Sequence, residues 1–234
     1  MNALLLLLLD SRAPAGAHHH SGGMEAAAAT GLVTDLTGLE DFCRAKLRTS
    51  ARVGAAFAAA ASRLQSSDPE QTGLGALQER WALLDAEFEA RTPSEAARAA
   101  SRQLGGGLLR LLRSALPKAD LVTPWTRCRG PAPHHPLVLG AGVALAGGAP
   151  GLAARAAALA ACAAPASAAV RLLGLDPFAV QAMLARLAPG IDECAQAAAR
   201  RAGQPPPCLP ADGAPALDLL ADYHLTTEVR LFAS

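Results

Sequence analysis

The chain has 234 residues, of which 51% are hydrophobic but only 3% aromatic, and its 21 Lys and Arg nearly balance its 20 Asp and Glu. Alanine and leucine supply most of the hydrophobic content, and isoleucine occurs once, at Ile191. Sheets need β-branched and aromatic side chains, whereas Ala and Leu favour helices, so the composition predicts an all-α fold. A net charge of +1 lacks the basic field of a nucleic-acid-binding surface, which excludes nucleic acid as the expected partner.

Two apolar segments imitate membrane-targeting sequences. The six leucines before Asp10 resemble the core of a signal peptide, but no Lys or Arg precedes them and charged residues follow at once. A buried first helix is therefore favoured over secretion. The uncharged stretch 131–154 could cross a bilayer by length, but its prolines, its His134-His135 pair and its Ala and Gly content favour a pair of core helices.

Residues typical of helix starts predict the helices before residue 120. Thr37 and Glu40 have the spacing of a capping box, which predicts a helix that runs from there toward Gln65. Asp68-Pro69 and the Thr-Pro-Ser-Glu segment at 92–95 predict two further helix starts with proline in the first turn. Two apolar stripes at helical spacing follow these starts: Trp81, Leu84 and Phe88, then Leu104, Leu108, Leu111, Leu112 and Ala115.

Three consecutive glycines, Gly105 to Gly107, interrupt the second stripe. Each glycine inside a helix lowers the stability of the helix by about 1 kcal/mol relative to alanine. Two explanations stay open: close helix packing, or a bend or partner-contact surface. The Pro-rich stretch 121–136 predicts a loop, after which helices resume near Leu137. Asp176-Pro177 predicts another helix start, and Pro189-Gly190 predicts a break before a helix from 191 to 201.

The C-terminal part is expected to contain a Pro-rich tether at 203–215, a short helix at 216–224 and a tail at 226–234. In the tail, Leu231 and Phe232 are apolar beside Arg230, a composition typical of a docking segment. The alternative, a tail that packs on its own domain, stays open. Together these elements predict one all-α domain over residues 1–234, a bundle of about eight to ten helices.

Candidate chemistry is sparse. His18, His19 and His20 could bind nickel, zinc or copper, with a structural or partner-contacting loop as the alternative, and His134-His135 is a similar but weaker pair. Ser21 lacks the GxSxG context of a nucleophile and equally fits the N-terminus of a helix over 24–30. No phosphate-cradling GxxxxGK[ST] sequence is present, so we expect no nucleotide hydrolysis by this chain and assign no catalytic residue.

The cysteines are five, widely spaced and without a CxxC pair: Cys43, Cys128, Cys162, Cys194 and Cys208. This pattern predicts neither a zinc site nor a disulfide framework. Isolated cysteines in a chain of this size are expected to pack as small hydrophobes in a reducing cytoplasm.

Several motifs in order along the chain resemble those of the urease accessory protein UreF family. The segment Leu8 to Glu25 (LLDSRAPAGAHHHSGGME) resembles the family's N-terminal signature, and RLFAS at 230–234 resembles the family's C-terminus. Two internal segments also resemble family motifs, HPLVLG at 135–140 and the region from Val170 to Pro177. The resemblance spans nearly the whole chain.

The resemblance implies an all-α, commonly dimeric, cytoplasmic adaptor without an active site of its own. Such a protein bridges the UreD (UreH) scaffold and the GTPase UreG, and the assembly uses GTP hydrolysis to install nickel in apo-urease. Nickel and GTP are then handled by the partner complex, and this chain needs no cofactor of its own. The residues carried over as partner-binding are His20, Ser21, Glu25, Arg230, Leu231, Phe232 and Ser234.

Two departures from the family pattern are present. His18 replaces the usual aromatic residue, and His224-Leu225 stands where many members have His-Glu, so the acidic residue of that pair is absent here. Two further functions are weighed against the adaptor: a nickel carrier that uses His18, His19 and His20, and a small hydrolase that uses Ser21.

Overall fold

The fold is known from a computed structural model that describes residues 3–10, 20–117, 131–225 and 231–232. Over these residues it contains eleven α-helices, one 3-10 turn and no strand, which confirms the all-α prediction. The number slightly exceeds the expected eight to ten because α5 is a single short turn of four residues. In chain order the helices are α1 (Ala3–Leu9), α2 (Met24–Ala29), α3 (Leu36–Arg48), α4 (Ser50–Gln65), α5 (Pro69–Thr72), α6 (Leu74–Ala90), α7 (Glu95–Ala115), α8 (His135–Leu145), α9 (Pro150–Leu173), α10 (Pro177–Arg201) and α11 (Pro215–Leu225).

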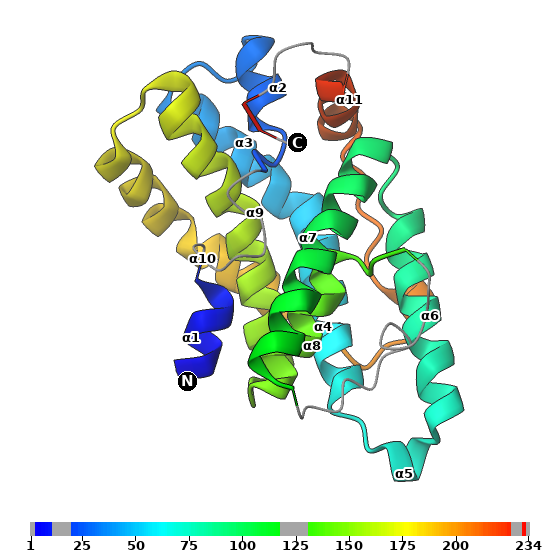
Figure 1. Cartoon of the computed structure of the whole chain (residues 1–234). Coiled ribbons are helices and arrows are strands. Elements are labelled where there is room, and N and C mark those ends of the chain that lie inside the picture. The colour runs from blue at the N-terminus through cyan, green and yellow to red at the C-terminus, as the bar shows by residue number, and fades with distance from the viewer. Residues whose placement is uncertain (1–2, 11–19, 118–130, 226–230, 233–234) are drawn as a thin grey trace.

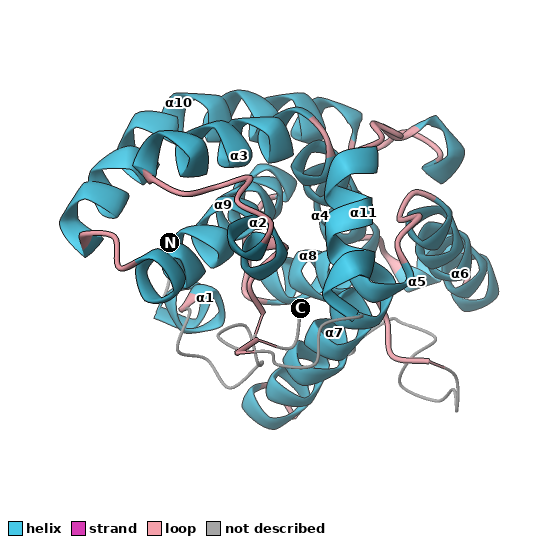
Figure 2. Cartoon of the chain, turned by 90° about the horizontal axis from the view of Figure 1, so that it is seen from above, coloured by secondary structure: helices cyan, strands magenta, loops and turns pink. Residues whose placement is uncertain are grey.

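Helix α4 lies at the centre, in contact with α8, α9 and α10 (Figure 1). The view from above places α3 and α10 along the top edge and α5 and α6 at the right-hand end (Figure 2). Small residues permit the tight crossings at the centre: a Cβ at Gly140 of α8 would lie 2.2 Å from the carbonyl oxygen of Ala58 in α4. The Ala-rich composition therefore serves close helix packing.

The two segments that imitate membrane sequences are core elements. In α1, Leu5 and Leu8 are buried in the core while Leu6 and Leu7 are exposed, so one face of the predicted buried helix is confirmed. Helix α9 is the one described helix long and apolar enough to cross a bilayer. One side of α9, including Ala154, Ala158 and Ala166, joins the core, and most of α8 is buried, as expected for a pair of core helices.

Several helix boundaries differ from those predicted. Asp35, not Thr37, caps α3, and its carboxylate accepts a hydrogen bond from the Gly38 N–H at 2.8 Å. The predicted single helix toward Gln65 is broken at Thr49, whose hydroxyl donates to the Ala45 carbonyl at 2.8 Å. The cap of α7 is Ser94, which accepts from the Ala97 N–H at 3.1 Å.

Pro189 does not break α10, and the predicted break is wrong. A proline inside a helix costs about 3 kcal/mol. Here one apolar stripe continues through the proline, and its burial offsets that cost. The buried residues of the stripe are Val180, Met183, Leu187, Ile191, Cys194, Ala195 and Ala198.

Two of the three glycines of α7, Gly105 and Gly106, serve close packing, one of the two explanations weighed from the sequence. A Cβ at Gly105 would lie 1.9 Å from the Pro133 carbonyl oxygen, and one at Gly106 would lie 3.2 Å from the Ala132 side chain. The neighbour is the segment that leads into α8, so the glycine lets α7 approach that segment's backbone.

The Pro-rich segment 203–214 lies along α4 and α6. It contains a 3-10 turn at Pro206–Cys208. Arg91 at the end of α6 donates to the carbonyl oxygens of Pro207, Leu209 and Pro210 at 3.0, 3.5 and 3.1 Å. The expected tether is thus fastened to the bundle along its length.

Candidate functional site

The N-terminal motif forms a tight turn into α2. Gly22 and Gly23 have φ of 62° and 89°, a left-handed backbone that favours glycine. Ser21 is fully buried, and its hydroxyl accepts a hydrogen bond from the Glu25 N–H at 3.2 Å. The hydroxyl therefore serves the helix start, which is the role weighed against a nucleophile.

Helices α3 and α9 form a platform under this turn. The Lys46 ammonium of α3 donates to the Gly22 carbonyl at 2.9 Å and lies 5.7 Å from the centre of the Phe42 ring. A Cβ at Gly22 would lie 3.3 Å from Pro165 of α9, so the turn rests directly on that helix. Burial lowers the pKa of Lys46.

The C-terminal tail docks on the N-terminal motif. The Glu25 carboxylate accepts from the backbone N–H groups of Leu231 and Phe232, at 2.6 and 3.1 Å. The Phe232 side chain is only 5% exposed, and the Arg171 guanidinium carbon lies 4.3 Å from its ring centre, a cation–π contact. Leu231 is 74% exposed. The tail thus buries one apolar side chain and exposes the other, and its described backbone runs beside α2 (Figure 1).

His20 is buried and lines a mostly apolar cavity of about 330 Å³. The cavity lies between the N-terminal turn, α4, α7, α9 and α11, and His135 faces it from the start of α8. Burial, and then the neighbouring His20, lower the pKa of His135 to about 4. His135 is therefore neutral at pH 7.

The structure brings together five of the predicted partner-binding residues and describes no more of them. Glu25 contacts Leu231 and Phe232 across more than two hundred residues of chain, and Ser21 and His20 lie beside Glu25 in the N-terminal turn. Arg230, Ser234, His18 and His19 lie outside the described residues. Within the described ranges, no group of three or more His, Cys, Asp or Glu is placed to hold a metal ion.

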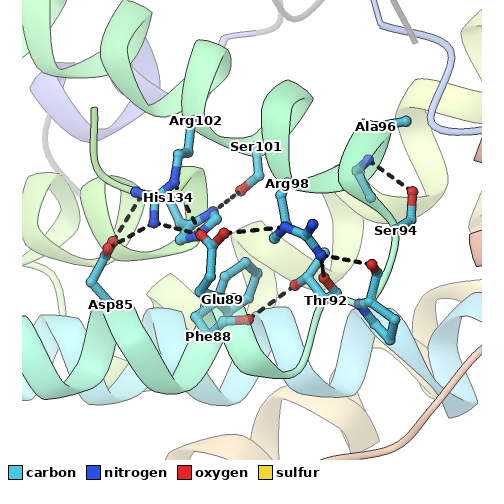
Figure 3. A network of polar contacts seen from close by, with 12 residues as sticks. Asp85, Phe88, Glu89, Thr92, Ser94, Ala96, Arg98, Ser101, Arg102 and His134 are labelled. Atoms are coloured by element: carbon cyan, nitrogen blue, oxygen red, sulfur yellow. Dashed lines mark hydrogen bonds and ion pairs between the residues drawn. The ribbon is translucent and has the colours of Figure 1, made fainter. Parts of the chain in front are cut away.

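His134, predicted as a weak ligand pair with His135, belongs to a separate polar network (Figure 3). Its Nε2 lies 2.6 Å from Glu89 and its Nδ1 lies 3.1 Å from the Ser101 hydroxyl. A carboxylate accepts only, so Nε2–H donates to Glu89 and Nδ1 accepts from Ser101. Burial lowers the pKa of His134, which keeps this ring neutral.

Arg102 completes this network. Its guanidinium contacts Asp85 at 3.0 Å and Glu89 at 2.5 Å, and it donates to the Ala132 carbonyl at 2.7 Å. Burial raises the pKa of Glu89, but the hydrogen bonds from Arg102 and His134 bring it below its ordinary value. The network fixes the chain that enters α8 to α6 and α7.

Two residues of the site were not found from the sequence. Lys46 falls on the polar side of the amphipathic pattern of α3, where a solvated role is the usual expectation. Arg171 follows an apolar run in α9 and carries no local sign that it stacks on Phe232. Both contacts are tertiary, and no periodicity encodes them.

Comparison with known proteins agrees with these motifs. The family model UreF matches residues 33–188. The urease accessory protein UreF of Mycobacterium sp. (strain JLS) is 43% identical over 231 residues, which cover 98% of this chain and 97% of the relative. UreF of Mycolicibacterium vanbaalenii is also 43% identical, over 99% of this chain and 98% of its own length. UreF of Mycobacterium marinum is 41% identical over the same shares. The chain therefore belongs to the UreF family of urease accessory proteins.

Proposed function

We propose that this chain is a non-enzymatic, cytoplasmic adaptor that bridges the UreD (UreH) scaffold and the GTPase UreG during GTP-dependent nickel insertion into apo-urease. Membership of the UreF family supports a role in urease maturation. The observation that carries the adaptor role is the Glu25 carboxylate, which ties the N-terminal motif to the C-terminal tail. The described parts of the two family motifs thereby form one site, which we call the terminal site: His20, Ser21, Glu25, Leu231 and Phe232.

Exposed apolar side chains around the terminal site fit a protein partner. Leu231 is exposed, and so are Leu32 after α2 and Leu219 and Tyr223 on α11, the helix that packs beside α2. Exposed large apolar side chains on neighbouring elements fit a protein contact. We propose that UreG docks on this side of the molecule.

In the proposed assembly, the partner proteins handle nickel and GTP. Nickel is the cargo, GTP is the substrate of UreG, and the adaptor chain carries out no chemical step. The assembly contains UreD, UreG and apo-urease, with two copies of this chain as a homodimer.

Substitution at the exposed tail residue tests the proposal. The complex of this chain with UreD is immobilised, and UreG is applied with GTP and nickel. We expect Leu231→Asp to reduce captured UreG at least tenfold and to lower the nickel content of reconstituted urease. Leu74→Asp is the matched control, because Leu74 is also exposed, at 60%, but begins α6 beside α5. Capture and nickel content that stay unchanged in Leu231→Asp would refute the docking role.

Removal of charge from the tail gives a second test. Arg230→Ala and deletion of residues 226–234 are expected to weaken UreG capture, whereas Arg110→Ala, an exposed arginine on α7, is expected to leave it intact.

The nickel-carrier alternative is tested by calorimetry on the isolated chain. Nickel binding tighter than about 100 μM, roughly 5.5 kcal/mol, that is lost on changing His18, His19 and His20 to alanine would support the carrier instead.

A further inference from the structure

Cys43 of α3 and Cys162 of α9 face each other across the helix pair. The Cys43 sulfur lies 3.8 Å from the Cys162 carbonyl oxygen, and the Cys162 sulfur lies 4.0 Å from the Cys43 carbonyl oxygen. Both thiols are completely buried. Because each sulfur reaches the other residue's backbone, the two side chains span the short gap that a disulfide bridges.

The two thiols differ in acidity. A hydrogen bond from the Cys43 thiol lowers the pKa of Cys162, and the Lys46 ammonium lowers it further against the opposing effect of burial. The same hydrogen bond and burial raise the pKa of Cys43. Cys162 is thus suited to attack as a thiolate and Cys43 to react second as a thiol.

A cavity lies next to α3 and α9. This cavity of about 330 Å³ is lined by Phe42, Lys46 and Ala161, which neighbour the two cysteines in sequence, but by neither cysteine. A hydroperoxide is small enough to occupy this space, and it reaches the buried thiols when the α3–α9 contact opens locally.

We propose that Cys43 and Cys162 are a modification site, a dithiol that hydroperoxides convert into an intramolecular disulfide between α3 and α9. The Cys162 thiolate attacks the outer peroxide oxygen, the O–O bond breaks, and the alkoxide or hydroxide that leaves takes up a proton. The sulfenic acid on Cys162 is then attacked by the Cys43 sulfur, the S–O bond breaks, and water leaves with the Cys43 proton. The two thiols lose two electrons in total, and the hydroperoxide gains them.

The disulfide acts on the platform under the terminal site. Lys46, one turn beyond Cys43, holds the Gly22 carbonyl, and Pro165, one turn beyond Cys162, supports the same glycine. A covalent bond between the helices therefore fixes the floor of the N-terminal turn. The disulfide goes beyond the proposed adaptor function and does not depend on it, whereas an effect on UreG capture rests on that function.

The test is made on the full chain with Cys128 and Cys208 changed to serine, because Cys208 is exposed and can cross-link molecules. The folded protein is treated with hydrogen peroxide, denatured, alkylated and analysed by mass spectrometry. We expect one alkyl group, on Cys194, where the untreated chain carries three, and a peptide pair that joins Cys43 to Cys162. Cys194→Ser is the matched control, since Cys194 is also buried, and we expect it to leave the disulfide unchanged.

The single variants separate the two steps. Cys43→Ser is expected to accumulate sulfenic or sulfinic acid on Cys162, and Cys162→Ser is expected to leave Cys43 as a thiol. Alkylation of both Cys43 and Cys162 after peroxide treatment of the folded chain would overturn the proposal, as would a disulfide that includes Cys194. These readouts need no partner protein, so their failure is distinct from failure of the adaptor role.

Discussion

Glu25 is predicted to control how often the C-terminal tail leaves the bundle. Its carboxylate accepts two backbone N–H groups of the tail, at 2.6 and 3.1 Å. Hydrogen bonds to charged groups contribute about 1.5 to 3 kcal/mol each when buried, but this contact is solvent-accessible, which reduces the pair to about 1 to 2 kcal/mol. Glu25→Ala loses both bonds, so the undocked population of the tail should rise about 5- to 30-fold.

Amide hydrogen exchange at Leu231 and Phe232 measures this population directly. Glu25→Ala should raise both exchange rates by the factor above, and Glu25→Gln should give a smaller increase because its carbonyl oxygen still accepts one bond. Glu193→Ala is the control, since Glu193 is an exposed acid on α10. Exchange at the two tail amides that is equal in Glu25→Ala and wild type would refute the reasoning.

Three further predictions concern stability and the Pro-rich segment. His135 takes up a proton below pH 6.5 in the unfolded chain but only near pH 4 in the folded chain. As the pH drops from 6.5 to 4, the free energy of unfolding should therefore fall by up to about 1.4 kcal/mol per pH unit. His135→Gln should flatten this slope in urea titrations, and an unchanged slope would contradict the assignment. Gly140→Ala should destabilise by about 3 kcal/mol or more in the same assay because its Cβ overlaps a neighbouring carbonyl, whereas Gly75→Ala, which meets nothing within 4 Å, should stabilise by about 0.5 to 1 kcal/mol. Arg91→Ala should expose residues 203–214 to limited proteolysis, and Arg110→Ala, an exposed arginine on α7, should not; equal cleavage would show that Arg91 does not hold the segment.

Elements with a local chemical signal could be predicted from the sequence. Asp68 and Asp176 each precede a proline and cap a helix, because a short carboxylate accepts from the free N–H groups of the first turn whatever the tertiary fold. The Trp81, Leu84 and Phe88 face is buried as its period predicts. These features need only neighbouring residues to be understood.

Elements decided by tertiary packing could not be predicted. Pro189 stays inside α10 because a buried stripe on both sides outweighs the local penalty, and the sequence shows the penalty more clearly than the packing. At the terminal site, the motifs that contain Glu25 and Phe232 were both found, but no pattern shows that one residue binds the other. Cys43 and Cys162 were likewise predicted as isolated small hydrophobes, and only the fold makes them a pair.

The central claim is that the two ends of the chain act as one docking surface for UreG. A double-mutant cycle tests it most directly, by measuring the affinity of GTP-loaded UreG for the complex of this chain with UreD. Glu25→Ala and deletion of residues 226–234 should each weaken binding, and the combined variant should bind no more weakly than the deletion alone. Losses that add in full, or affinities that none of the variants changes, would contradict the account.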